Sequence, residues 1–134
     1  TKNLTIGATR NWSRTVLEWN LAADSNLQPH TKGGCDACLG ALTIDGDNVK
    51  RNAAYYIIAH ASKLVVPGSK RVESSVIKDL PNVAFITPQG ETVLILLNNS
   101  KKIKTFSVQQ KTKEGTQQSS AYTIPAQSVV TLQL

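Results

Sequence analysis

The stretch Thr15–Asp24, TVLEWNLAAD, decides the fold that we expect. Its first part, Thr15–Leu21, predicts a strand because it combines β-branched and apolar residues with one aromatic and holds no Gly or Pro. A long polar loop follows, and a helical pattern then runs from about residue 51 to about residue 65. Strand, loop and helix make a β/α unit, in which binding chemistry collects on the loop after the strand. Trp19 and Asn20 are therefore the first candidate binding residues, the alternative being that Trp19 only fills a core.

The helix is predicted from apolar residues spaced three and four apart within Asn48–Val65, and Pro67 followed by Gly68 ends it. Earlier in the chain, Asn3–Trp12 is compatible with the last turns of another helix. The loop contains a possible short strand, Leu39–Ile44, with a turn directly after it.

After Pro67 the pattern becomes that of a sheet with turns about every ten residues, which favours an antiparallel β-sandwich. Glu91–Leu97 (ETVLILL) is continuously apolar and should lie at the centre of a sheet, whereas Lys111–Ser120 should be a polar hairpin loop. We expect a mostly β chain with residues 1–67 as a β/α unit and residues 68–134 as the sandwich. The predicted strands are Val83–Thr87, Thr92–Asn98, Lys102–Gln109, Ala121–Ile124 and Ser128–Leu134.

Composition narrows the classes of function. The chain has 134 residues and a formal net charge of +6, yet its late lysines are scattered among Ser, Thr and Gln with no stacking aromatics beside them. We expect a solvated surface and no nucleic-acid partner, with weak polyanion binding as the alternative. No apolar run approaches the roughly 20 residues that span a bilayer. The sequence has no Met, which fits a processed or excised product.

Two histidines and two cysteines are the remaining candidates for chemistry. Cys35 and Cys38 form a CxxC in a Gly-rich loop, where a disulfide or paired thiols are favoured over metal because only His30 lies near as a third ligand. A thioredoxin-like role would need the motif to open a helix. His60 falls near the apolar face of the predicted helix, so packing is favoured over catalysis.

Long motifs give the chain a resemblance to glycoside hydrolase family 30, the glucosylceramidase family. NWSRTVLEWNLA (Asn11–Ala22) resembles the segment that ends in the eighth barrel strand, and GGCDACLG (Gly33–Gly40) resembles the loop after it. YYIIAHASK (Tyr55–Lys63) is similar to the eighth helix. PNVAF (Pro81–Phe85) and VLILLNN (Val93–Asn99) resemble two strands of the family's β-sandwich.

The resemblance implies a (β/α)8 barrel with a side β-sandwich that cleaves a β-glucoside or related β-glycoside with retention. Its two catalytic glutamates belong to strands four and seven, which precede the matched segments, so we expect no catalytic residue in this chain and no activity of the chain alone. Glu18 matches neither position, whereas Trp19 matches a residue of the sugar pocket and Asn20 adjoins it. The expected partners are the rest of the barrel and a β-glycoside substrate, with no cofactor.

A single β/α unit would expose apolar surface, so the chain alone should self-associate or swap segments. The resemblance is to bacterial-type members, so we expect a secreted or periplasmic protein. The alternative function is a non-catalytic β-sandwich that binds carbohydrate or packs against a domain, although its aromatic residues after position 72 are few: Phe85, Phe106 and Tyr122.

Overall fold

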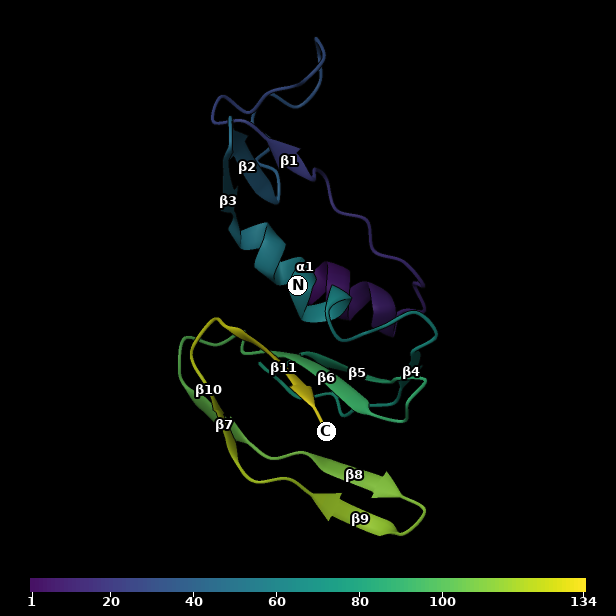
Figure 1. Ribbon diagram of the computed structural model, residues 1–134. Coiled ribbons are helices and arrows are strands. Elements are labelled where there is room, and N and C mark those ends of the chain that lie inside the picture. Colours follow the sequence, from purple (N-terminus) through teal and green to yellow (C-terminus); the bar gives the residue numbers. More distant parts are fainter.

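The computed structural model describes residues 1–134 and confirms a mostly β fold with one α-helix. In Figure 1, strands β1–β3 and helix α1 lie at one end of the molecule, and the remaining strands form layers at the other end. The elements are η1 (Lys2–Ala8, a π-helix), β1 (Ala22–Ala23), β2 (Leu42–Asp45), β3 (Asn48–Arg51), α1 (Ala53–Ser62), β4 (Lys70–Val72), β5 (Asn82–Ile86), β6 (Thr92–Leu97), β7 (Lys104–Phe106), β8 (Gln109–Thr112), β9 (Gly115–Gln118), β10 (Tyr122–Ile124) and β11 (Val129–Gln133).

The central sheet has four antiparallel strands in the order β11-β6-β5-β4. Strand β6 pairs Ile95 with Val83 of β5 and with Thr131 of β11, so it lies inside the sheet as its apolar run predicts. Residues 93–96 are all buried. A strand covered on both faces reads as a continuous apolar run, which is why this one was predictable.

The two faces of this sheet bury different clusters. Val83, Phe85 and Ile95 pack with Ile6 of η1, and α1 adds Ala61 at the margin of the same cluster. On the other face, Leu96 packs with Leu80 and Ile124, the latter from the two-stranded β7–β10 sheet. The sheet is therefore covered by helices on one face and by strands on the other (Figure 1).

The predicted polar loop Lys111–Ser120 is wrong in its interior, because β8 and β9 form an antiparallel hairpin with Thr112 opposite Gly115. All eight residues of the hairpin are polar or Gly, so no alternation of apolar side chains marks its strands. Backbone pairing and a side-chain hydrogen bond from Gln109 to Gln118 (2.9 Å) hold it instead.

The predicted strand Thr15–Leu21 does not form at those residues; only Ala22–Ala23 are paired, in parallel with β2. The physical reason is the lack of a neighbour. Strand structure requires a hydrogen-bonded partner, and the backbone of residues 16–19 forms no hydrogen bond with other backbone in this chain. The first ladder contacts come at Asn20 and Leu21, whose carbonyl oxygens accept from Ala41 (3.0 Å) and Leu42 (2.9 Å).

The helix predicted over Asn48–Val65 is also shorter than expected, since α1 covers Ala53–Ser62. Asn48–Arg51 is strand β3 instead, and it forms a hairpin with β2 through a turn at Gly46, whose φ of 57° suits glycine. The other secondary-structure predictions hold in outline: η1 is helical, and Leu39–Ile44 overlaps β2. Strand β4 was not predicted. No helix in the structure has the length and hydropathy of a membrane span.

Candidate functional site

Trp19 and Asn20 lie near the carboxyl end of residues Thr15–Leu21, which we call the extended segment and which directly precede β1. The Trp19 side chain is 81% exposed, so it contributes almost nothing to a core within this chain. Asn20 is half-buried and its Oδ1 accepts a hydrogen bond from the backbone N–H of Ala22 at 2.9 Å. The peptide bond between the two residues is cis. The site thus combines an unoccupied indole face with an amide whose Nδ2 donors have no partner in the protein.

The backbone that carries these residues is fixed by close packing behind it. A Cβ at Gly40 would lie 2.7 Å from the Ala22 Cα, so only glycine lets the returning loop touch β1. Asn52 is 8% exposed, and its Nδ2 donates to the Gly40 carbonyl and to Thr43 Oγ1, both at 2.9 Å. Sequence reasoning missed Asn52. Its place directly before a helical pattern is the only signal, and that signal suggests a helix cap.

The cysteine loop leads away from this site. Cys35 and Cys38 form a disulfide with their Cα atoms 5.5 Å apart, and most of the loop around them is exposed. His30 bonds locally, with its Nε2 2.9 Å from Gln28 Nε2. No group of three or more His, Cys, Asp or Glu residues in the structure could hold a metal ion.

His60 occupies a structural position between α1 and β11. Its Nδ1 lies 3.0 Å from Thr131 Oγ1, and the same hydroxyl donates to the His60 carbonyl oxygen at 3.0 Å. The hydroxyl has one proton, which goes to that carbonyl, so Nδ1 must be the donor in the first bond. Burial lowers the pKa of His60 below its usual 6.5, because the charged ring would lose hydration.

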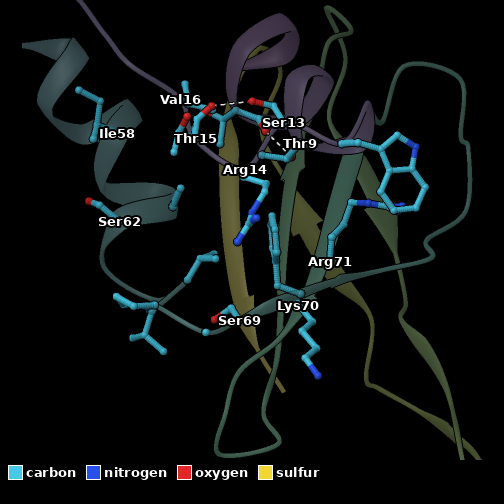
Figure 2. Close-up of a pocket in the computed structure, with 18 of the residues that line it drawn as sticks. Thr9, Ser13, Arg14, Thr15, Val16, Ile58, Ser62, Ser69, Lys70 and Arg71 are labelled. Atoms are coloured by element: carbon cyan, nitrogen blue, oxygen red, sulfur yellow. Dashed lines mark hydrogen bonds between the residues drawn. The ribbon is translucent and has the colours of Figure 1, made fainter.

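A pocket of about 820 Å³ lies elsewhere, between the segment at residues 13–18, helix α1 and strand β4 (Figure 2). One wall is apolar, with Ile58 and Val65. Trp12 and Arg71 make another wall, where the guanidinium carbon lies 4.4 Å from the centre of an indole ring. A cation over a Trp face is an attractive arrangement, so each side chain limits the movement of the other.

Two polar atoms at this pocket are buried without a hydrogen-bond partner, Arg71 Nε and Ser69 Oγ. Arg14, directly before the extended segment, lines the same pocket (Figure 2). This arrangement could not be predicted from the sequence, because Trp12 and Arg71 come from segments 59 positions apart.

Comparison with known proteins identifies the family. Residues 68–132 match the domain family described as glycosyl hydrolase family 30 beta sandwich domain. The solved endo-β1,6-glucanase BT3312 superposes with a TM-score of 0.82 and 32% identity over 97% of this chain. This chain belongs to glycoside hydrolase family 30. The family 30 resemblance drawn from the sequence is therefore confirmed.

Curated relatives agree. Endo-1,6-beta-D-glucanase neg1 of Aspergillus fumigatus is 30% identical over 103 residues, covering 72% of this chain and 21% of its own length. Lysosomal acid glucosylceramidase of Mus musculus is 31% identical over 88 residues, covering 63% of this chain and 17% of its own length. The chain thus spans about a fifth of the curated relatives that it matches, and 29% of the BT3312 chain.

Proposed function

We propose that this chain is the C-terminal part of a retaining β-glycosidase that hydrolyses β-glucosidic bonds, with β-1,6-glucan as its substrate. The observation that carries the proposal is the similarity over 97% of the chain to an endo-β1,6-glucanase of known structure. A fungal relative named for the same activity supports it. Glucosylceramide is the second candidate substrate, since the mouse glucosylceramidase is comparably identical over a shorter length.

Trp19 and Asn20 supply the sugar contacts in this proposal. The apolar face of a pyranose ring can lie against an aromatic ring, and an indole that is 81% exposed is available for such a contact. The free Nδ2 of Asn20 can donate to a sugar hydroxyl, while its Oδ1 remains bound to the Ala22 N–H. These two groups bind and orient a sugar, and they do not carry out the chemical step.

The chemistry itself requires two carboxyl groups about 5–5.5 Å apart on either side of the scissile bond. In the family pattern these are glutamates of strands four and seven, and neither corresponds to a residue of this chain. We therefore expect the 134-residue chain alone to be inactive, and the rest of a barrel to be its partner.

The alternative of a carbohydrate-binding sandwich has less support. Phe85 is buried in the first core cluster, and Phe106 and Tyr122 pack against each other with ring centroids 5.7 Å apart. These three aromatic residues form no flat exposed platform for a glycan.

The test is activity of the intact enzyme that contains this chain. Purified enzyme is assayed on β-1,6-glucan, glucosylceramide and xylan, with the 134-residue chain assayed in parallel. We expect turnover of β-1,6-glucan by the enzyme and none by the chain. Trp19→Ala should lower kcat/KM on the preferred substrate at least about tenfold, as loss of one stacking contact would. Tyr56→Ala is the control, because Tyr56 is an exposed aromatic residue of α1 that lies outside the pocket in Figure 2.

We also propose that the protein is exported. Support comes from the Cys35–Cys38 disulfide in an exposed loop, since disulfides persist in oxidising compartments and are rare in the cytosol. After alkylation of protein isolated from its native host, mass spectrometry of the peptide that contains Cys35 and Cys38 should find neither cysteine alkylated. Alkylation of both cysteines would contradict export.

A further inference from the structure

Asn52 stands where a helix cap is expected, yet its side chain does not cap the helix. It directly precedes α1 with extended backbone (φ −88°, ψ 171°), which is the geometry of an N-cap, and Asn is among the residues most favoured there. Its side chain makes no capping hydrogen bond to the first turn of α1. The helix therefore lacks a cap that its own sequence could provide, because this side chain is bonded elsewhere.

The Asn52 side chain is bonded to the loop that returns from the disulfide. Its Nδ2 donates to the Gly40 carbonyl and to Thr43 Oγ1, both at 2.9 Å. Its backbone N–H donates to the Ala41 carbonyl, also at 2.9 Å. Asn52 thus holds residues 40 and 41 through its side chain and its backbone together. The residue is only 8% exposed, so water does not readily replace these bonds when they are lost.

The same loop residues hold the candidate sugar site. The Ala41 N–H donates to the Asn20 carbonyl at 3.0 Å. Gly40 packs so closely on Ala22 that a Cβ would lie 2.7 Å from the Ala22 Cα. Asn20 Oδ1 accepts from the Ala22 N–H at 2.9 Å. The place of the free Asn20 Nδ2 therefore depends on where residues 40 and 41 lie.

A single residue separates the two asparagines. Ala41 bonds to Asn52 with its carbonyl and to Asn20 with its N–H, and it is 4% exposed. A packed interior has little free space, so a displacement at one end of so short a link is passed to the other. A role in helix stability alone would direct the Asn52 side chain to the first turn of α1, whereas it points to the loop.

We propose that Asn52 is a positioning residue of the glycosidase, which holds residues 40 and 41 in place so that the Asn20 amide meets the sugar. The inference rests on the function proposed above and deepens it, because Asn20 is a sugar contact of that function. Asn52 does not touch the sugar itself. Its effect is on the affinity for the substrate and not on the chemical step.

The first experiment compares Asn52→Ser with the wild type in the intact enzyme, on the substrate that the enzyme prefers among the three named above. Serine is a favoured N-cap residue, but its short side chain cannot make the two bonds of the Asn52 amide. We expect KM to rise about fivefold, as for one weakened hydrogen bond, and kcat to change less than about twofold. The melting temperature should stay close to that of the wild type. Asn52→Asp is a second variant with the same expected result, since an ionised carboxylate keeps the shape of the amide but has no donor.

Asn82→Ser is the matched control. Asn82 is 5% exposed, and its Nδ2 donates to the carbonyls of Ser75 and Leu80, both at 3.0 Å, so it resembles Asn52 in burial and bonding. It belongs to β5 of the central sheet and not to the loop or to β1. Asn82→Ser should lower the melting temperature and leave KM within about twofold of the wild type. An equal rise of KM in both variants would mean that KM follows stability, and would overturn the inference.

The second experiment is a double-mutant cycle between positions 52 and 20. If Asn52 acts through Asn20, Asn52→Ser should raise KM less than about twofold in an Asn20→Ala enzyme, because the group that it positions is already absent. A merely structural role would give the same rise of KM in both backgrounds. That result would refute the inference.

Hydrogen exchange on the intact enzyme follows the link without any substrate. The N–H groups of Ala41 and Leu42 donate to the Asn20 and Leu21 carbonyls at 3.0 and 2.9 Å. Both amides should exchange about tenfold faster in Asn52→Ser than in the wild type, because the loop opens more easily. Unchanged exchange at both amides would overturn the inference.

The outcomes distinguish the inference from the proposed function. A wild-type enzyme that hydrolyses a β-glucoside, with KM unchanged in Asn52→Ser and in Asn52→Asp, would overturn the inference alone. A wild-type enzyme without activity on any of the three substrates would overturn the proposed function. Faster exchange at Ala41 in Asn52→Ser would then still support the link from Asn52 to Asn20.

Discussion

The extended segment Thr15–Leu21 and the central sheet both have apolar residues in a strand-like pattern, but these residues lie in opposite environments. Leu17 is 91% exposed, whereas Val83, Val93 and Ile95 are fully buried. The two backbones differ in the same way: residues 16–19 form no backbone hydrogen bonds, whereas β6 is hydrogen-bonded to a strand along each edge. The comparison teaches that the sheet supplies its own neighbours within the chain and the segment does not. The apolar residues of the segment have no packing surface within this chain, whereas those of the sheet are packed against the rest of the chain.

The largest expected effect tests the sheet. Ile95→Ala removes a fully buried side chain from the cluster with Val83, Phe85 and Ile6, and should lower the free energy of unfolding by about 3 kcal/mol. Urea denaturation followed by circular dichroism measures the change. Ile103→Ala is the matched control, because Ile103 is 68% exposed and its loss should cost under about 0.5 kcal/mol. Equal losses of stability in the two variants would contradict the difference in burial between the sheet and exposed positions.

A smaller effect is expected at Asn98, which is fully buried at the end of β6. Its Nδ2 donates to the carbonyls of Lys102 (2.7 Å) and Pro125 (2.8 Å), and its Oδ1 accepts from Ser100. Asn98→Ala removes these hydrogen bonds, together with the buried one to the Ile124 carbonyl, from a fully buried position, so we expect a loss of about 2 kcal/mol in the same denaturation assay. The exposed neighbour Asn99 is the control, and a loss from Asn99→Ala as large would contradict this account.

The next effect depends on pH and tests the contact between α1 and the sheet. Burial lowers the pKa of His60 in the folded state, so the unfolded state binds more protons as the pH falls below 6.5. Stability should therefore fall from pH 7 toward the lowered folded pKa and then level off. The change should be smaller than the two above, because much of the ring remains in contact with water. His60→Gln should remove this component, whereas His30→Gln, in the exposed loop, should leave it.

The smallest effect is expected in the extended segment. Trp19→Ala should change the free energy of unfolding of the 134-residue chain by less than about 0.5 kcal/mol, because the side chain is almost entirely exposed. Thermal unfolding measures it. A loss above 1 kcal/mol would mean that the indole is buried in solution, as a self-associated chain would bury it, and would sharpen the comparison into one between monomer and oligomer.

Local sequence patterns determine which of these strands are predictable. The β6 strand was predicted because its information is local: a continuous apolar run with turn residues on either side. Thr15–Leu21 carries an equally clear strand pattern, yet pairing depends on a partner that no local pattern can report. The β8–β9 hairpin was missed for the converse reason, since its strands pair without any apolar side chain.

Some residues of the candidate site were also predictable from local sequence, and others were not. Trp19 and Asn20 were found because they stand in a long family motif near a strand end, and the comparisons support that family. Their roles in sugar binding remain predictions. Asn52, Gly40 and the stack of Arg71 on Trp12 were not found, because each depends on a contact between segments far apart in the sequence. Such contacts leave no periodicity or motif behind.

The paired hydrogen bonds between His60 and Thr131 also bear on the order in which this fold can be completed during synthesis. They span 71 positions, and Thr131 lies in β11, the strand that also closes one side of β6. During synthesis η1, α1 and β6 are made before β11. Until β11 is made, β6 has one unpaired edge and α1 lacks its hydrogen bonds to Thr131. An open apolar strand is where a nascent chain pairs wrongly. Synthesis that pauses before residue 129 should therefore be the step most exposed to aggregation.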